Sequence, residues 1–144
     1  MKLEIPENIY EEIVLQAKAE APIEACGILA GKINLIEKLY KMKNIDQSNN
    51  HFMMLPAEQF KVVKDIRSSG LEMLAIYHSH PETPARLSEE DIRLALTPDV
   101  VYIIVSLQDV NNPILKGFII EDYIPEEINV KIHKNKDASK TTKK

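Results

Sequence analysis

The strongest chemical signal in this sequence is a pair of histidines separated by one residue, His78 and His80, after the apolar run 73–77. On a β-strand, side chains two residues apart project from the same face. Both imidazoles can therefore bind one metal ion at about 2.0–2.1 Å from each nitrogen. The pair alone is weak evidence, because two such histidines occur more often on a solvated strand face than in a metal site.

Asp91 lies eleven residues after His80, on the first turn of a predicted helix. The loop 81–87 is long enough to fold that turn back onto the end of the strand, where the carboxylate would supply a third ligand. Three protein ligands with a water in the fourth position are typical of catalytic zinc. The ion lowers the pKa of that water towards about 7.

Ser88, three residues before Asp91, has two interpretations. Ser-x-x-Asp at the start of a helix resembles a capping box, in which the two side chains satisfy free backbone amides. Alternatively, the hydroxyl donates a hydrogen bond to the oxyanion that forms when water attacks a carbonyl group. One hydroxyl is not expected to serve both positions well.

Glu24 precedes a short apolar run, 26–30, that begins at Cys26. At the end of a neighbouring strand, the Glu24 carboxylate would take a proton from a catalytic water and later give it to the leaving amine. A lone glutamate is more often a surface charge, and that alternative stays open. Cys26 is expected to be a buried, inert thiol, with nucleophile or regulatory fourth ligand as the alternatives.

The elements that must position these residues follow from hydrophobic periodicity and from turn residues. Helices are predicted over 6–20, from 56 to the turn at 68–70, and over 88–96. Strands are predicted over 26–30, 36–45, 73–77 running into the histidines, 100–106 and 115–124. The order αββαβαββ indicates an α/β (α+β) class with a mixed β-sheet flanked by helices.

Length and composition indicate a single globular domain, since the 144 residues are 44% hydrophobic and 28% charged. No apolar run approaches the roughly 18 residues of a membrane span. The N-terminus does not resemble a secretory signal, so a cytoplasmic protein is expected. The single cysteine excludes an internal disulfide framework.

Charge divides the chain into an acidic body and a basic tail. Residues 131–144 hold six lysines and one acid, and we expect a disordered tail there after a domain over 1–130. The first 130 residues carry 12 basic and 21 acidic side chains. Because duplex affinity comes mainly from phosphate neutralisation, we expect no nucleic-acid partner, and no membrane partner either.

Four segments together resemble the JAMM/MPN+ metalloprotease domain, in its compact prokaryotic form. They are Pro22-x-Glu24-x-Cys26-Gly27-x-Leu29-x-Gly31, Tyr77-His78-Ser79-His80-Pro81, Ser88-x-x-Asp91 and the strand 102–106. The resemblance covers roughly residues 1–125. It implies one zinc ion per chain held by His78, His80 and Asp91, Glu24 as general acid/base, and Ser88 as oxyanion stabiliser.

The same resemblance implies a class of substrate, and other functions remain as alternatives. Family members cleave after the diglycine terminus of ubiquitin-like proteins, and prokaryotic members act on β-grasp modifiers and sulfur carriers. Leu87 stands where prokaryotic members often have proline, and no long insertion supports linkage-specific polyubiquitin cleavage. The principal alternative is a non-catalytic MPN-type module that binds a ubiquitin-like partner. A DNA-repair-associated relative fits the acidic body poorly, and homodimerisation is left open.

Overall fold

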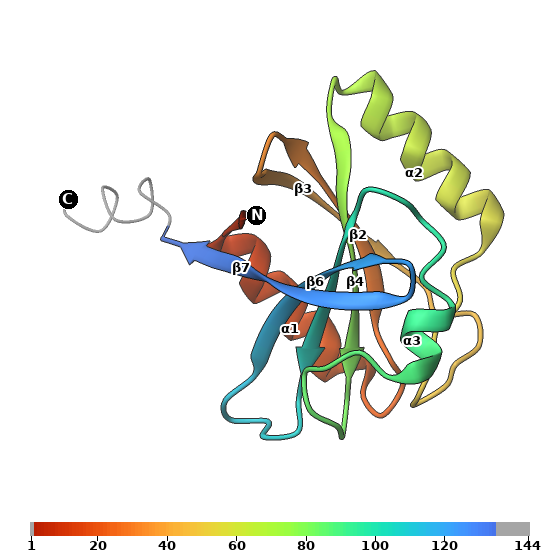
Figure 1. Cartoon of the computed structure of the whole chain (residues 1–144), viewed down its shortest axis with the longest axis vertical. Coiled ribbons are helices and arrows are strands. Elements are labelled where there is room, and N and C mark those ends of the chain that lie inside the picture. Colours follow the sequence, from red (N-terminus) through yellow and green to blue (C-terminus); the bar gives the residue numbers. More distant parts are fainter. Residues whose placement is uncertain (1, 135–144) are drawn as a thin grey trace.

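The computed structural model describes residues 2–134, which form seven strands and three helices (Figure 1). The strands are β1 (Lys2–Pro6), β2 (Cys26–Lys32), β3 (Leu35–Met42), β4 (Glu72–His80), β5 (Val101–Ser106), β6 (Ile114–Glu121) and β7 (Ile124–His133). The helices are α1 (Glu7–Glu20), α2 (Pro56–Ser68) and α3 (Glu89–Arg93). None of the helices in this part of the chain is long and apolar enough to cross a membrane.

The strands close into a barrel in the order β1-β3-β2-β4-β5-β6-β7. Pairing is mixed: β4 and β5 run parallel, whereas β2 pairs antiparallel with both β3 and β4. The parallel pairing of β1 with β7 completes the ring. The expectation of a mixed sheet with helices is therefore confirmed.

Two strands of the barrel, β1 and β7, were not predicted from the sequence. β1 has only five residues, and β7 begins with the exposed segment 124–127 before Ile128, Val130 and Ile132 alternate with polar residues. Because β7 continues to His133, the first residues of the segment 131–144 belong to the sheet. Residues 135–144 of the expected tail lie outside the described residues.

The two long helices cover opposite faces of the central strands. Ile9, Ile13 and Ala17 of α1 join a buried cluster with Leu29 of β2. Val62 and Ile66 of α2 join a second cluster with Cys26, Ile28 and Ala30 of the same strand. Alternate β2 residues thus point to opposite helices, which explains why the strand is apolar on both faces.

The third helix is shorter than predicted, because it ends at Arg93 rather than near Leu96. Tyr102 of β5 is responsible for part of this difference. Its hydroxyl accepts a hydrogen bond from the Thr97 amide and donates one to the Thr97 carbonyl, both at 2.9 Å. These bonds hold the chain in a non-helical path just before Pro98, whose ring also disfavours helix in the preceding residue.

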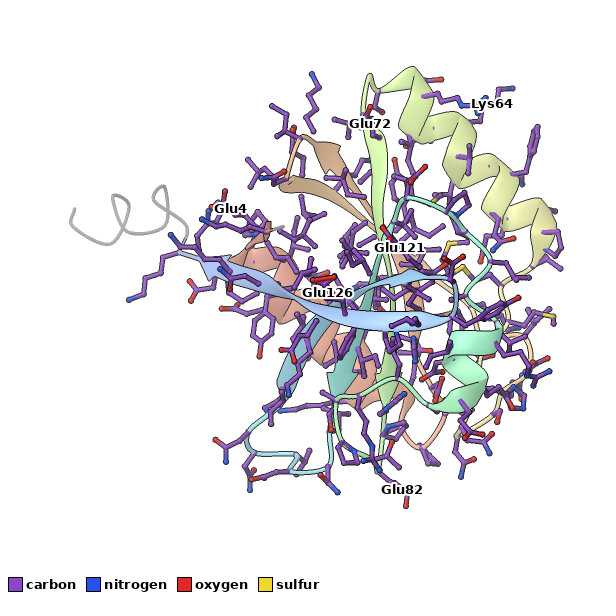
Figure 2. All side chains as sticks on the ribbon, in the orientation of Figure 1. Glu4, Lys64, Glu72, Glu82, Glu121 and Glu126 are labelled. Carbon is purple, nitrogen blue, oxygen red and sulfur yellow. The ribbon has the colours of Figure 1, made fainter. Side chains whose placement is uncertain are left out.

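Gly27 permits a close approach that aligns β2 with β4. A Cβ atom at Gly27 would lie 2.2 Å from the ring of Tyr77, and the Tyr77 hydroxyl donates to Gln16 Oε1 on α1. This contact packs β4 tightly just before its first histidine. Charged side chains such as Lys64 and Glu82 project outward, away from this packed interior (Figure 2).

Candidate metal centre

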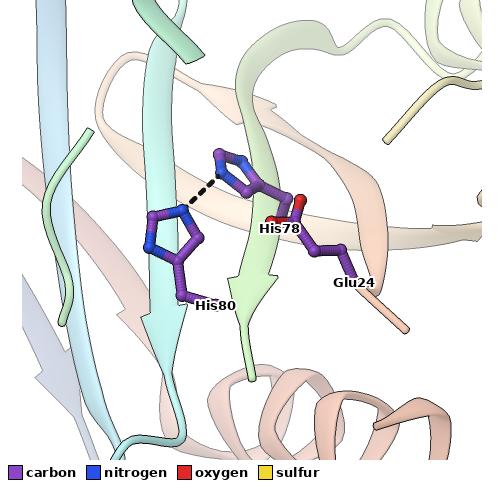
Figure 3. Close-up of side chains that lie close together, drawn as sticks. All are labelled: Glu24, His78 and His80. Carbon is purple, nitrogen blue, oxygen red and sulfur yellow. Dashed lines mark hydrogen bonds between the residues drawn. The ribbon is translucent and has the colours of Figure 1, made fainter. Parts of the chain in front are cut away.

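The carboxyl end of β4 carries the two histidines into a buried position. His78 is 2% exposed and His80 is 5% exposed. Their Nε2 atoms lie 3.2 Å apart, and Figure 3 shows the two imidazoles turned towards each other beside Glu24. The alternation expected of a strand therefore places both rings on one face, and the solvated-face alternative is wrong.

The loop after β4 folds back so that α3 brings Asp91 to the histidines. Asp91 Oδ1 lies 3.3 Å from His78 Nε2, and Oδ2 lies 3.1 Å from His80 Nε2. Two contacts hold the loop in this path: His80 Nδ1 lies 2.9 Å from the Pro84 carbonyl, and the Ser106 hydroxyl donates to the Thr83 carbonyl at 2.6 Å.

These separations fit a tetrahedral metal ion. Ligands placed about 2.0–2.2 Å from zinc at tetrahedral angles lie roughly 3.3 Å from one another. The Nε2 atoms of His78 and His80 and the Asp91 carboxylate are separated by 3.1–3.3 Å. His80 Nδ1 faces the Pro84 carbonyl, so Nε2 is the ring nitrogen turned towards His78 and Asp91.

Asp91 supplies a negative charge to the centre. Burial works to raise the pKa of Asp91, but hydrogen bonds from His78 and His80 hold it well below the ordinary value, so the carboxylate is ionised. Burial lowers the pKa of His78, which keeps this ring neutral. Burial also opposes the charged form of His80, yet Asp91 and the Pro84 carbonyl raise its pKa overall.

Glu24 is a buried side chain, only 2% exposed, and not the surface charge of the alternative interpretation. Its backbone is fixed from two sides: the side-chain amide of Asn44 donates to the Glu24 carbonyl at 3.0 Å, and the backbone amide of Glu24 donates to the Ser48 carbonyl at 2.8 Å. Donor atoms of Glu24, His78 and His80 all lie within 4.8 Å of one another.

The environment of the Glu24 carboxyl favours proton binding. Burial raises its pKa to about 8, with His80 opposing the shift and Asp91 and Glu90 adding to it. Among the described residues, Glu24 Oε1 has no hydrogen-bond partner. Burying a carboxylate oxygen without a hydrogen bond destabilises the folded state unless a cation or a water molecule contacts it.

Ser88 forms the capping box expected from its spacing. Its Oγ accepts from the Asp91 amide at 3.0 Å, and the Ser88 amide donates to Asp91 Oδ2 at 2.9 Å. Capping occupies a lone pair of the hydroxyl, whereas oxyanion stabilisation would use its proton. The two interpretations are thus compatible, contrary to the expectation from sequence.

Cys26 is fully buried on β2, opposite His78 in the sheet. Its Sγ donates to the Met42 carbonyl at 3.8 Å, and burial raises the pKa of the thiol to about 12. The thiolate required of a nucleophile or metal ligand is therefore strongly disfavoured. The expected inert core thiol agrees with this environment.

Several residues near the centre had no signal in the sequence. The Asn44 side chain contacts the Glu24 carbonyl across 20 residues of chain, and the Pro84 carbonyl contacts His80, which lies four residues before it. Phe52 stacks on His78 with ring centroids 4.8 Å apart and lines a cavity of about 450 Å³ that His78 and Asp91 also border. Only the tertiary arrangement brings the Phe52 loop to the histidines.

Known proteins match the segments that carry this site. Residues 6–115, which contain all five candidate site residues, match the family model described as prokaryotic homologs of the JAB domain. The CysO-cysteine peptidase of Mycobacterium tuberculosis is 33% identical over 132 residues, covering 89% of this chain and 90% of that protein. The desampylase of Pyrococcus furiosus is 31% identical over 102 residues, covering 71% and 72%.

Among solved structures, protein DSY2949 from Desulfitobacterium hafniense has a TM-score of 0.85 at 39% identity, covering 94% of each chain. The resemblance drawn from the sequence motifs is confirmed by the family match, which spans the strands, the loop and the helix that form the centre. The chain belongs to the family of prokaryotic homologues of the JAB domain.

Proposed function

We propose that this protein is a zinc-dependent isopeptidase or peptidase that cleaves after the C-terminal diglycine of a ubiquitin-like modifier or sulfur-carrier protein. The observation that carries the proposal is the convergence of His78, His80 and Asp91 within 3.3 Å, with Glu24 buried beside them. The related CysO-cysteine peptidase and desampylase support a β-grasp protein conjugate as the substrate class.

In this proposal one zinc ion per chain is held by His78, His80 and Asp91. Asp91 is favoured over Glu24 as the third ligand because its oxygens lie 3.1 and 3.3 Å from the two imidazole nitrogens. The ion would supply an activated water at neutral pH and polarise the scissile carbonyl.

Glu24 and Ser88 would perform the proton and charge chemistry. The Glu24 carboxylate accepts a proton from the attacking water and passes it to the departing amine, a role that suits a pKa raised by burial. The Ser88 hydroxyl, whose lone pair caps α3, donates its proton towards the carbonyl oxygen as negative charge develops there.

The test is cleavage of small β-grasp proteins fused through a C-terminal diglycine to a reporter peptide, with products identified by mass spectrometry. We expect the cut directly after the diglycine, loss of cleavage on chelation and recovery with zinc. Glu24→Gln should keep the metal and lose turnover, whereas the matched control Glu72→Gln, on the exposed start of β4, should retain both.

Turnover retained by Glu24→Gln would contradict the proposed mechanism. The alternative of a non-catalytic interaction module makes the opposite prediction throughout: the modifier binds equally well after chelation, and its tail stays intact. The complete set of converging donor atoms argues against that alternative.

A further inference from the structure

The two histidines of the metal centre differ in the contact that fixes the plane of each ring. His80 Nδ1 lies 2.9 Å from the Pro84 carbonyl, a hydrogen-bond partner of the kind that commonly orients a metal-bound imidazole. His78 Nδ1 is buried and has no hydrogen-bond partner among the described residues. A different contact must therefore orient the His78 ring.

Within residues 2–134, the polar contacts of the His78 ring lie at its other nitrogen, Nε2. This atom is 3.2 Å from His80 Nε2 and 3.3 Å from Asp91 Oδ1, and Figure 3 shows it turned towards His80. Rotation about the bond from Cβ to the ring would carry Nε2 away from both groups, and no hydrogen bond at Nδ1 opposes that rotation. Such freedom would weaken metal binding, because a ligand must keep its lone pair directed at the ion.

Phe52 makes the contact that restricts this rotation. Its ring is stacked on the His78 ring, with the centroids 4.8 Å apart and an angle of 25° between the two planes. Offset-stacked aromatic pairs attract one another at centroid separations of roughly 4.5–7 Å. Because the two rings lie face to face, a rotated imidazole would collide with Phe52, so the stacking holds His78 Nε2 in place.

Phe52 is itself held by Asn44, a buried side chain that is 3% exposed. Asn44 Nδ2 donates to the His51 carbonyl at 3.0 Å, and Oδ1 accepts from the Met53 amide at 3.1 Å. These two hydrogen bonds fix the backbone on both sides of Phe52. Asn44 Nδ2 also donates to the Glu24 carbonyl at 3.0 Å, so one amide fixes both the stacked ring and the proposed proton acceptor.

We infer that Phe52 is a positioning residue for the zinc ligand His78, and that its ring orients His78 as the Pro84 carbonyl orients His80. This inference rests on the zinc site of the proposed function. Phe52 offers no ligand atom of its own, so it acts on the ion only through the imidazole stacked against it. Removal of the ring should therefore change how tightly zinc is bound and how its ligands are arranged.

The test measures metal binding by the full chain carrying Phe52→Leu, which keeps an apolar side chain and removes the ring. Zinc affinity, measured by competition with a chromophoric chelator, should fall about tenfold, a loss typical of removing a contact that orients a metal ligand. The visible d–d absorption of bound Co²⁺ reports the coordination geometry and should change as well. Phe52→Met, another apolar side chain without a ring, should give the same two results.

Two further variants separate ring stacking from general effects on the fold. Phe52→Tyr retains the ring, and the cavity of about 450 Å³ that Phe52 borders leaves room for the hydroxyl, so this variant should bind both metals as the wild type does. The matched control Phe60→Leu makes the same change on α2, where the side chain is 72% exposed, and should leave both measurements unchanged. Denaturant unfolding of each metal-free chain measures stability separately.

Wild-type zinc affinity and an unchanged Co²⁺ spectrum in Phe52→Leu and Phe52→Met would overturn the inference, whatever the effect on stability. So would an equal loss in Phe52→Tyr, because the ring would then not account for the effect. Zinc binding and conjugate cleavage that are both unaffected by Phe52→Leu remove only the positioning role. A Phe52 effect on zinc binding without cleavage of any conjugate removes only the proposed peptidase activity, whereas a wild-type chain that binds no zinc removes both.

Discussion

Ser79 and Ala25 are joined by two hydrogen bonds that tie the histidine strand to the segment carrying Glu24. The Ala25 amide donates to Ser79 Oγ at 2.8 Å, and the Ser79 amide donates to the Ala25 carbonyl at 2.9 Å. Ser79 lies between the two histidines and Ala25 directly follows Glu24. These bonds therefore set the distance between the proposed proton acceptor and the metal centre.

Ser79→Ala should weaken this tie without touching a metal ligand. It removes the partner of the buried Ala25 amide, and an unsatisfied buried donor costs about 1–3 kcal/mol of stability. We expect kcat to fall while zinc content is unchanged, because Glu24 moves and the histidines do not. Denaturant unfolding, metal analysis and steady-state kinetics measure the three effects.

Two further variants separate positioning from general destabilisation at Ser79. Ser79→Thr retains the oxygen and should recover most of the lost kcat. Ser68→Ala removes an exposed hydroxyl at the end of α2, away from the centre, and should change neither stability nor rate. A Ser79→Ala protein with full kcat would show that the tie does not position Glu24.

His80→Ala should abolish metal binding, because it removes one of three converging donors. Elemental analysis of the wild type after zinc incubation should give about one zinc per chain, and of the variant about none. At zinc concentrations about 100-fold above the dissociation constant, binding should stabilise the wild type by about 2.7 kcal/mol.

The control for this measurement is His133→Ala on β7, where the histidine lies 3.7 Å from Glu4 and outside the centre. It should bind zinc as the wild type does. A wild-type chain that stays free of zinc after incubation would contradict the assigned ligands and favour the interaction-module alternative.

Ser88→Ala should separate the two roles of the serine, because one role affects stability and the other affects kcat. Loss of the cap costs about 1 kcal/mol of stability. Loss of an oxyanion donor reduces kcat by about 100-fold or more. Both effects are expected, measured by unfolding and by kinetics on the folded protein. A change in stability alone would leave Ser88 with only its capping role.

Cys26 should resist alkylation in the native protein. With burial raising the pKa of its thiol to about 12, little thiolate is present at pH 8, and iodoacetamide should react only after unfolding. The unfolded thiol loses its proton near pH 9 and the folded thiol does not. Stability therefore falls as pH rises from about 9 to 12.

Comparison with Cys26→Ala isolates this pH effect, because tyrosines also titrate in the same range. Between pH 8 and pH 10 the variant should lose less stability than the wild type, as measured by denaturant unfolding at both values. Rapid labelling of the folded wild type at pH 8 would contradict a buried, neutral thiol.

Those parts of the centre that depend on short spacing could be predicted from the order of the residues. Alternation along a strand places His78 and His80 on one face, whatever the strand packs against. The three-residue spacing of Ser88 and Asp91 is the geometry of a first helical turn, which is why their capping box could be predicted. Periodicity likewise indicated α1, α2 and the central strands, since each buries an apolar stripe.

How distant segments meet follows from the packing of the folded chain and could not be predicted in this way. The burial of Glu24 depends on Asn44 and Ser79, which lie 20 and 55 residues further along the chain. Closure of the barrel depends on pairing β1 with β7, which lie at opposite ends of the described residues, and the short alternation in each strand does not encode this pairing. Long-range register and burial arise from the packing of the whole chain, so no local spacing of residue types encodes them.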